Sequence, residues 1–364
     1  MVILYIFATV VFVNCMYYFL FSKFSFSQTK ETKIHKQLPV SLLVCAKNEA
    51  ENLKTHIPFW LEQEYPDFEI ILINDASFDE TLEVMESFAE KNSTIKIVDV
   101  ENNEAFWGSK KYALTLGIKK ATHPQLIFTD ADCKPSSKHW LKEMAAHLQE
   151  KKQLVLGFGA YQKFPGILNR LIRFETLMTA IQYFSYSKAG IPYMGVGRNI
   201  GYTSSLFYAN NGFMSHMEIP SGDDDLFVNQ VATSKNTAIC FSEDSFTYSV
   251  PKKSWKDWVL QKKRHISTAK YYQFKHKFLL GLYYISEVLF WTLSIVSFLL
   301  LDWKIPVILI TFRFLIKYIV VGKAAKKLHQ KDLIFLLPIW ELLLVLVHFT
   351  IFISNIASKP TKWK

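Results

Sequence analysis

Residues 126–132 read LIFTDAD, and this stretch decides the fold of the middle of the chain. Its first four residues form a short apolar run typical of a buried strand, and Asp130 and Asp132 follow at once. Ligands of open α/β sheets bind beyond the carboxyl ends of the strands, where these two carboxylates would lie. The stretch therefore predicts a buried strand with a ligand-binding site at its end.

Strand and helix patterns alternate over residues 38–129. Short apolar runs at 40–45, 69–73 and 95–98 are typical of buried strands. Helical patterns separate them: one opens at Asn48 with Glu51 in capping-box spacing, a second starts within 77–80, and a third covers 110–120. Such alternation predicts a mostly parallel, Rossmann-like sheet.

The pair Asp130 and Asp132 has two interpretations. Carboxylates one residue apart can hold Mg²⁺ or Mn²⁺ beside a substrate diphosphate, and the ion would neutralise charge on the leaving group. Alternatively, Asp132 or Ser136 caps a helix that starts near Ser137.

Two other acidic positions allow a similar choice. Asp75 follows the run 69–73 and could accept a hydrogen bond from a base or ribose, or it could be a turn residue. Residues 222–225 read GDDD, and adjacent carboxylates raise at least one pKa, which suits a general base near neutral pH. These acids would also complement the dipole of a helix that begins here, and both interpretations can hold.

Three further segments carry candidate residues. Lys110 could contact a donor phosphate or be an exposed helix lysine. The segment GVGRNIG at 195–201 does not fit the G-x-G-x-x-G fingerprint, and we interpret it as a tight backbone lining a cleft. The basic cluster QKKRH at 261–265 could bind a diphosphate through its arginine or touch anionic lipid beside a membrane.

Both ends of the chain are apolar. Residues 1–21, 278–301, 305–321 and 333–354 are each near membrane-spanning length, and the first lacks the features of a cleaved signal peptide. The basic residues that follow the first segment predict a cytoplasmic middle domain; they are Lys23, Lys30, Lys33, His35 and Lys36. Four spans would place the C-terminus outside, against its tail of lysines (Lys359, Lys362 and Lys364). Either one segment is re-entrant or the charges of the tail are tolerated outside. The helical pattern at 166–190 predicts either an interfacial helix or an amphipathic core helix.

Charge and cysteine content narrow the class of protein. The chain of 364 residues has a net charge of +10, which in a membrane protein indicates cytoplasmic lysines and arginines, and no nucleic-acid-binding motif is present. No pair among the four cysteines has metal-ligand spacing, which favours reduced thiols. Three charged residues interrupt the C-terminal apolar segments, and we expect Arg313 to pair with Glu287 or Glu341; a transport role is the alternative.

Taken together, these motifs resemble family 2 glycosyltransferases, which carry a GT-A fold, over about residues 38–272. The membrane layout is similar to that of the branch containing polysaccharide synthases and ceramide glucosyltransferases. The resemblance implies a nucleotide-binding turn at Lys47, Asn48 and Glu49 and a base contact at Asp75. Lys110 matches the lysine of a donor-binding segment written Gly-Lys-x-x-Ala-Leu, with Ser109 in place of the glycine.

The remaining roles also come from the resemblance. Asp130 and Asp132 match the metal-binding Asp-x-Asp, with Asp130 also on the donor side, and Asp224 matches the catalytic base of a Gly-Asp-Asp segment. Gln261 and Arg264 match the diphosphate-binding Gln-x-x-Arg-Trp motif of polymerising members. In this chain, His265 stands in place of the tryptophan of that motif. Because that tryptophan helps hold a growing polymer, its replacement favours single transfers. The residues implied on the acceptor side are Asp223, Gly197 and His265.

The sequence therefore predicts an α/β GT-A enzyme: a membrane anchor at 1–22, a cytoplasmic catalytic domain at 38–272 with an interfacial helix at 166–190, and transmembrane helices at 278–355. It would be an inverting, metal-dependent glycosyltransferase of the cell (inner) membrane. It would move a sugar from a nucleotide-sugar donor, UDP-linked by the resemblance, to a lipid-type or membrane-proximal glycan acceptor. The alternatives are a processive polysaccharide synthase and an inactive membrane scaffold that binds nucleotide-sugar.

Overall fold

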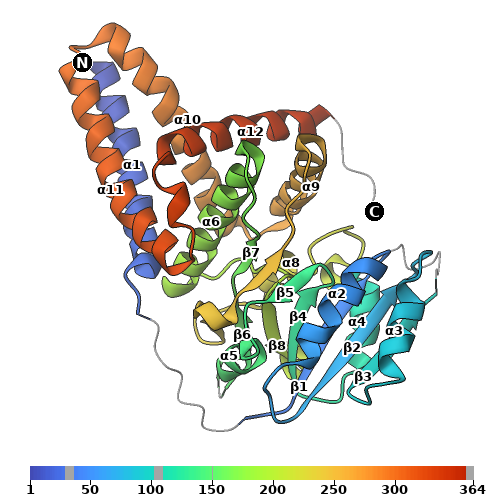
Figure 1. Ribbon diagram of the computed structural model, residues 1–364. Coiled ribbons are helices and arrows are strands. Elements are labelled where there is room, and N and C mark those ends of the chain that lie inside the picture. Colours follow the sequence, from blue (N-terminus) through green and yellow to red (C-terminus); the bar gives the residue numbers. More distant parts are fainter. Residues whose placement is uncertain (29–36, 102–109, 150, 358–364) are drawn as a thin grey trace. The chain divides into compact units, whose positions relative to one another are not determined.

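The computed structural model describes residues 1–28, 37–101, 110–149 and 151–357, which form two compact units (Figure 1). One unit contains the main sheet and comprises the described parts of 37–162 together with Gly190–Pro251. The other contains the long apolar helices and comprises Met1–Gln28, Lys163–Ala189 and the chain from Lys252 onward. Ser109 and the lysines expected to flank the apolar segments at 30–36 and in the C-terminal tail lie outside the described residues.

The sheet unit confirms the four predicted strands. Among the described residues, a seven-stranded sheet has the order β3-β2-β1-β4-β8-β6-β9, and a three-stranded sheet has the order β5-β10-β7. Neighbours from β3 to β4 pair in parallel, whereas β8 is antiparallel to both β4 and β6. The strands are β1 Val40–Ala46, β2 Phe68–Asp75, β3 Ile95–Val100, β4 Gln125–Asp130, β5 Cys133–Pro135, β6 Leu154–Leu156, β7 Gly159–Tyr161, β8 Ile200–Thr203, β9 Thr237–Ile239 and β10 Thr247–Ser249.

Helices cover both faces of the parallel part of the sheet, which explains why its strands are apolar on both sides. Leu42, Val44 and Leu72 join one hydrophobic core with residues of α2 Ala50–Leu61, α3 Thr81–Ala89 and α5 Trp140–Ala146. The opposite face receives α4 Lys110–Lys120, in which Gly117 lies so close to the sheet that an added Cβ would come within 2.2 Å of Ile73. Two short helices, α7 Ser204–Ala209 and α8 Asp225–Val231, complete the unit.

The expected helix starts at Asn48 and Ser137 were wrong. The first helix, α2, begins at Ala50 after Glu49, whose side chain does not cap it; the Ala50 N–H donates to the Asp79 carboxylate at 3.3 Å. Asn48 has a positive φ of 55°, and its side-chain oxygen instead accepts a hydrogen bond from the backbone N–H of Phe78 at 3.0 Å. The Asn48 side chain therefore joins the turn after β1 to the turn after β2. Similarly, α5 begins at Trp140, so neither Asp132 nor Ser136 caps it.

The second unit consists of α1 Val2–Ser25, α6 Ile167–Lys188, α9 Trp255–Thr268, α10 Phe274–Leu300, α11 Lys304–Lys327 and α12 Leu337–Ala357. Four of these, α1, α10, α11 and α12, are long and apolar enough to cross a membrane. The pairing expected for Arg313 is confirmed, since its guanidinium contacts Glu287 at 2.8 Å and Glu341 at 2.7 Å in the buried interior. Most of α6 is buried as well, against α1, α11 and α12.

One side chain joins several elements of the sheet unit. Asn199 is fully buried; its amide donates to the carbonyls of Phe158 at 3.0 Å and Ser245 at 2.7 Å, and its oxygen accepts from the Trp140 indole at 3.1 Å. It therefore links α5 to the segments that precede β7 and β10.

We expect Asn199→Ala to lower the midpoint of thermal unfolding clearly, because each buried group left unpaired costs about 1–3 kcal/mol. Thermal unfolding in detergent measures this. Asn92→Ala is the matched control, since Asn92 is only partly buried and bonds one carbonyl of its own turn. Equal midpoints for the two variants would contradict the structural role of Asn199.

Candidate active site

The strand register brings the predicted nucleotide-binding residues to one edge of the sheet. Cys45 pairs with Asp130, and Ala46 pairs with Asn74, so β1, β2 and β4 end side by side. The turn that contains Lys47, Asn48 and Glu49 follows β1 directly. Asp75 is the last residue of β2, and Asp130 is the last residue of β4. Parallel strands therefore place these residues together where open α/β sheets bind ligands.

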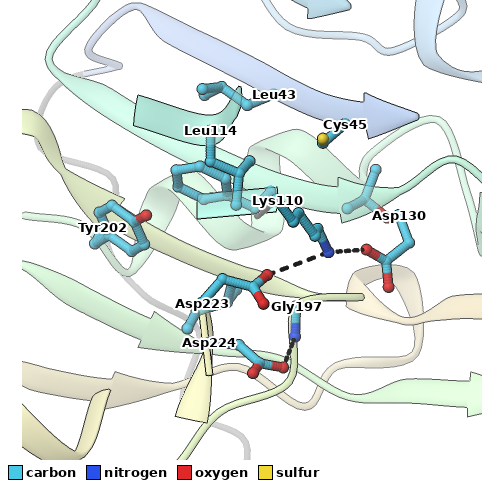
Figure 2. Close-up of a pocket in the computed structure, with 12 residues that line it drawn as sticks. Leu43, Cys45, Lys110, Leu114, Asp130, Gly197, Tyr202, Asp223 and Asp224 are labelled. Carbon is cyan, nitrogen blue, oxygen red and sulfur yellow. Dashed lines mark hydrogen bonds and ion pairs between the residues drawn. The ribbon is translucent and has the colours of Figure 1, made fainter. Parts of the chain in front are cut away.

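Lys110 connects two of the acidic motifs (Figure 2). As the first residue of α4, it places its ammonium 2.7 Å from Asp130 and 3.2 Å from Asp223. Burial alone would lower the pKa of Lys110, but the two carboxylates outweigh it and raise that pKa well above its ordinary value. Lys110 is thus a partly buried ion-pair partner, with its side chain 14% exposed, and its interpretation as an exposed helix lysine is wrong.

Asp224 is held by two backbone N–H groups. Its carboxylate accepts from Gly197 at 2.6 Å and from Asp225 at 2.7 Å, and it caps the start of α8, as one interpretation of the acidic run predicted. The other interpretation, a general base, stays a prediction. Burial, followed by the charges of Asp223 and Asp225, raises the pKa of Asp224 to about 7. A carboxylate with this pKa can accept a proton near neutral pH.

A glycine is required just before these acids. Gly222 has a φ of +99°, and an added Cβ would come within 2.4 Å of the Leu226 side chain. The turn into the acidic run is therefore open only to glycine.

Acidic groups and apolar side chains line a small cavity between the strand ends and α8 (Figure 2). The acidic and basic groups come from α4, β4 and the start of α8, and Gly197 contributes backbone, as expected for a segment that lines a cleft. The lining residues are Leu43, Cys45, Lys110, Leu114, Phe128, Thr129, Asp130, Gly197, Ile200, Tyr202, Asp223 and Asp224.

The donor set at Asp130 and Asp132 fits a hard divalent cation. One possible ligand atom from each of Asp130, Asp132 and Cys133 lies within 4.8 Å of the others. Burial, followed by the charge of Asp130, raises the pKa of Asp132 to about 6. Burial also raises the pKa of the Cys133 thiol well above its ordinary value, and this thiol donates to Asp132 at 3.5 Å. Two carboxylates with a protonated thiol behind them suit Mg²⁺ or Mn²⁺ better than a thiophilic ion.

Asp75 is a buried carboxylate with an unused acceptor. It is 5% exposed, and its Oδ2 accepts no hydrogen bond from any part of the chain that the structure describes. Burial raises the pKa of Asp75, against the charges of Lys47 and Lys110. An orphaned acceptor at a strand end is suited to a ligand that donates a hydrogen bond.

Sequence reasoning missed Arg198. Its carbonyl accepts from the hydroxyls of Thr129 at 3.0 Å and Thr247 at 2.9 Å, and its guanidinium stacks on Tyr161 at 4.2 Å. The charge of Arg198 also opposes the rise in the pKa of Asp132. The available signal was the lone arginine in the otherwise uncharged segment 195–201.

Three predicted site residues lie elsewhere. Gln261, Arg264 and His265 are on α9, in the unit of apolar helices, so their contact with a diphosphate or acceptor stays a prediction. Asp223 and Gly197 are brought to the cavity, but their acceptor-side roles also stay predictions.

The fold is that of GT-A glycosyltransferases. The structure of the mannosyltransferase PcManGT from Pyrobaculum calidifontis, in complex with GDP-Man and Mn²⁺, superposes with a TM-score of 0.61 and covers 94% of this chain and 98% of that chain. Its sequence is 16% identical, so this likeness concerns the fold alone.

Residues 41–206 match the model of glycosyl transferase family 2. This segment, which is less than half of the chain, is similar to the glycosyltransferases of that family.

Two relatives show how varied the members are. The poly-beta-1,6-N-acetyl-D-glucosamine synthase of Staphylococcus epidermidis is 37% identical over 122 residues, which cover 33% of this chain and 28% of the relative. The cholesterol galactosyltransferase of Borreliella burgdorferi is 36% identical over 102 residues, covering 28% of this chain and 27% of the relative. The chain thus matches less than a third of the length of either relative.

The raised pKa of Asp224 makes stability depend on pH. The folded protein keeps this group protonated up to about pH 7, whereas the unfolded chain releases the proton near its ordinary pKa of 3.8, so stability falls as the pH rises between these values. Asparagine cannot ionise. The free energy of unfolding of Asp224→Asn, relative to wild type, should therefore rise over this interval and level off above it.

Unfolding in detergent at a series of pH values measures this difference. Asp67→Asn is the control, because the Asp67 side chain is 68% exposed. Any constant cost of a lost hydrogen bond in Asp224→Asn would shift its curve without changing its slope. A difference from wild type that stays flat across the interval would show that the pKa of Asp224 is not raised.

Proposed function

We propose that the protein is an inverting, metal-dependent glycosyltransferase that uses a nucleotide-sugar donor. The observation that supports this most is Asp224, a partly buried carboxylate with a pKa of about 7 beside the ion pair of Lys110 with Asp130. Asp224 takes the proton of an acceptor hydroxyl as that oxygen bonds to the anomeric carbon of the donor sugar. The bond from that carbon to the diphosphate breaks, and the nucleoside diphosphate leaves with the electron pair.

Asp130 and Asp132 would hold the divalent cation, Mg²⁺ or Mn²⁺, through their carboxylates. When bound, such an ion neutralises charge that develops on the departing diphosphate. Gln261 and Arg264 on α9 would bind the diphosphate oxygens, a task for which a planar guanidinium is well suited.

The donor nucleoside would lie at the ends of β1 and β2. The orphaned acceptor of Asp75 suits an N–H group of the base, and Lys47, Asn48 and Glu49 occupy the turn beside it. Lys110 would exchange part of its contact with Asp130 for the donor. We favour a UDP-linked sugar, although the complex of PcManGT contains GDP-Man, so both nucleotides belong in a test.

The acceptor we favour is a lipid or a membrane-proximal glycan that receives a single sugar. His265 stands where polymerising members have tryptophan, and the name of the Borreliella relative specifies a lipid acceptor. The polymer in the name of the Staphylococcus relative supports the alternative, a processive synthase. The intact set of Asp130, Asp132 and Asp224 argues against an inactive scaffold.

We further propose that the protein is an integral protein of the cell (inner) membrane with its catalytic domain in the cytoplasm. Three helices would cross, namely α1, α10 and α11. The later part of α1 lies beside the start of α10, where the Tyr17 hydroxyl donates to the Leu279 carbonyl at 2.6 Å. The end of α1 also lies beside the end of α11, where the Lys327 ammonium donates to the Phe24 carbonyl at 2.9 Å. Figure 1 shows α12 crosswise to α1 and α11. Because membrane helices tilt by about 20° on average and 40° at most, a helix crosswise to these spans does not cross with them.

This topology places the C-terminus on the cytoplasmic side, as its lysines favour. An alkaline phosphatase fused to the C-terminus should be inactive, and a fluorescent protein there should be fluorescent. Fusions in the turn between α10 and α11, at residues 301–303, should behave in the opposite way. Active phosphatase at the C-terminus would instead mean that α12 spans the membrane.

Purified protein in detergent should release nucleoside diphosphate from one donor in a panel of UDP- and GDP-sugars with Mn²⁺ or Mg²⁺. Asp132→Ala should lose this release because the metal site is broken. Asp224→Asn should lose transfer but keep metal-dependent donor binding by calorimetry. Wild-type transfer should increase as the pH rises through about 7, where Asp224 ionises.

Asp67→Ala, an exposed aspartate at the opposite end of β2 from Asp75, controls for non-specific effects and should remain active. Transfer at the wild-type rate by Asp224→Asn would remove that residue from the role of base. A complete lack of release and of donor binding by folded wild-type protein would support the scaffold alternative.

A further inference from the structure

The second lysine of α4, Lys111, is buried in the catalytic unit, and its role is not explained by donor binding. It is 1% exposed, and its ammonium donates to the carbonyls of His216 and Ile219, each at 2.6 Å. Its neighbour Lys110 turns to Asp130 and Asp223. The first two residues of α4 therefore bind two different parts of the active site.

The two carbonyls belong to the loop that leads to Asp224, the proposed catalytic base. This loop turns through η2 Met214–His216, and the backbone N–H of Ile219 donates to His216 at 3.1 Å. Three residues after Ile219, the positive φ of Gly222 turns the chain into Asp223 and Asp224. Residues 216–222 are thus a short connection between the Lys111 ammonium and the base.

The charges around Lys111 come from three elements. Asp223, Asp225 and Asp224 face it from the start of α8, His216 lies on the loop, and Lys110 precedes it on α4. Burial lowers the pKa of Lys111 to about 8, against the three carboxylates, so it is largely protonated at neutral pH. Burial, and then Lys111, lowers the pKa of His216 to about 4, so this imidazole is neutral there.

We propose that Lys111 is a positioning residue for the reaction: it holds the 216–222 loop so that Asp224 stays on the Gly197 N–H, and it keeps a positive charge beside the base. The ammonium does not touch the donor or acceptor in this mechanism. A buried cation that binds two carbonyls loses both contacts if the loop moves, so it opposes motion of the loop more strongly than one hydrogen bond would. The inference rests on the assignment of Asp224 as the base.

The test compares Lys111→Met with Lys119→Met, a change at the exposed end of the same helix. Lys111→Met should reduce kcat by about tenfold or more, because small displacements of a catalytic group are costly, while the KM for donor changes little. The acid limb of its kcat–pH profile should move to higher pH, since the charge that favours ionised Asp224 is gone. Lys111→Arg, which keeps the charge and the donors, should restore part of kcat and the wild-type pH limb.

Hydrogen exchange of peptides covering 213–222 gives a readout that does not depend on catalysis. These amides should exchange faster in Lys111→Met, and those of β1 should not. If Lys111→Met does not fold, Lys111→Gln, which loses the charge but keeps a donor, replaces it with the same expected results. A wild-type kcat and pH limb, or unchanged exchange in the loop, would overturn the proposal.

These results separate the two levels of inference. If Asp224→Asn transfers sugar at the wild-type rate, the assignment of the base fails, whatever Lys111 does. If Asp224→Asn is inactive but Lys111→Met keeps a wild-type kcat and pH limb, the base stands and the positioning role of Lys111 fails.

Discussion

The contact of the Lys110 ammonium with the carboxylates of Asp130 and Asp223 is the interaction on which the active site depends. These carboxylates come from distant segments of the chain, and a partly buried acid is costly without a partner, so a cation must be present where they meet. Helix α4 supplies it because Lys110 is its first residue. The close packing of Gly117 on Ile73 holds the helix against the sheet and so determines where the ammonium lies.

Three consecutive residues then relate Asp224, the proposed base, to the proposed metal-binding motif. Gly197 donates its N–H to Asp224, Arg198 accepts from Thr129 beside Asp130, and Asn199 bonds to α5 and two loops. Because these bonds use the backbone or fully buried groups, the segment has little freedom to shift. The proposed base and the proposed metal ligands, which lie on different strands and helices, are thereby held in one geometry, as the proposed transfer would require.

The apolar unit contains charges that cancel. Arg313 and Lys317 lie between Glu287 and Glu341, and Asn14 of α1 also contacts Arg313. Groups this deeply buried are stable only when paired, and the pairing joins α1, α10, α11 and α12 in one arrangement. This favours a structural role for these charges over a transport path.

The sequence by itself determined the strands β1 to β4, helix α4 and the acids at the strand ends, because apolar runs and helical periodicity are local properties. It also indicated a general base in the run of aspartates, since adjacent like charges raise a pKa in most surroundings. It did not predict that the Asn48 side chain bonds Phe78 instead of capping a helix. Only the tertiary structure decided that Lys110 is an ion-pair partner, and only it placed Arg198 and Lys111. These contacts join residues from 20 to more than 100 positions apart, so they depend on which strand ends and loops meet.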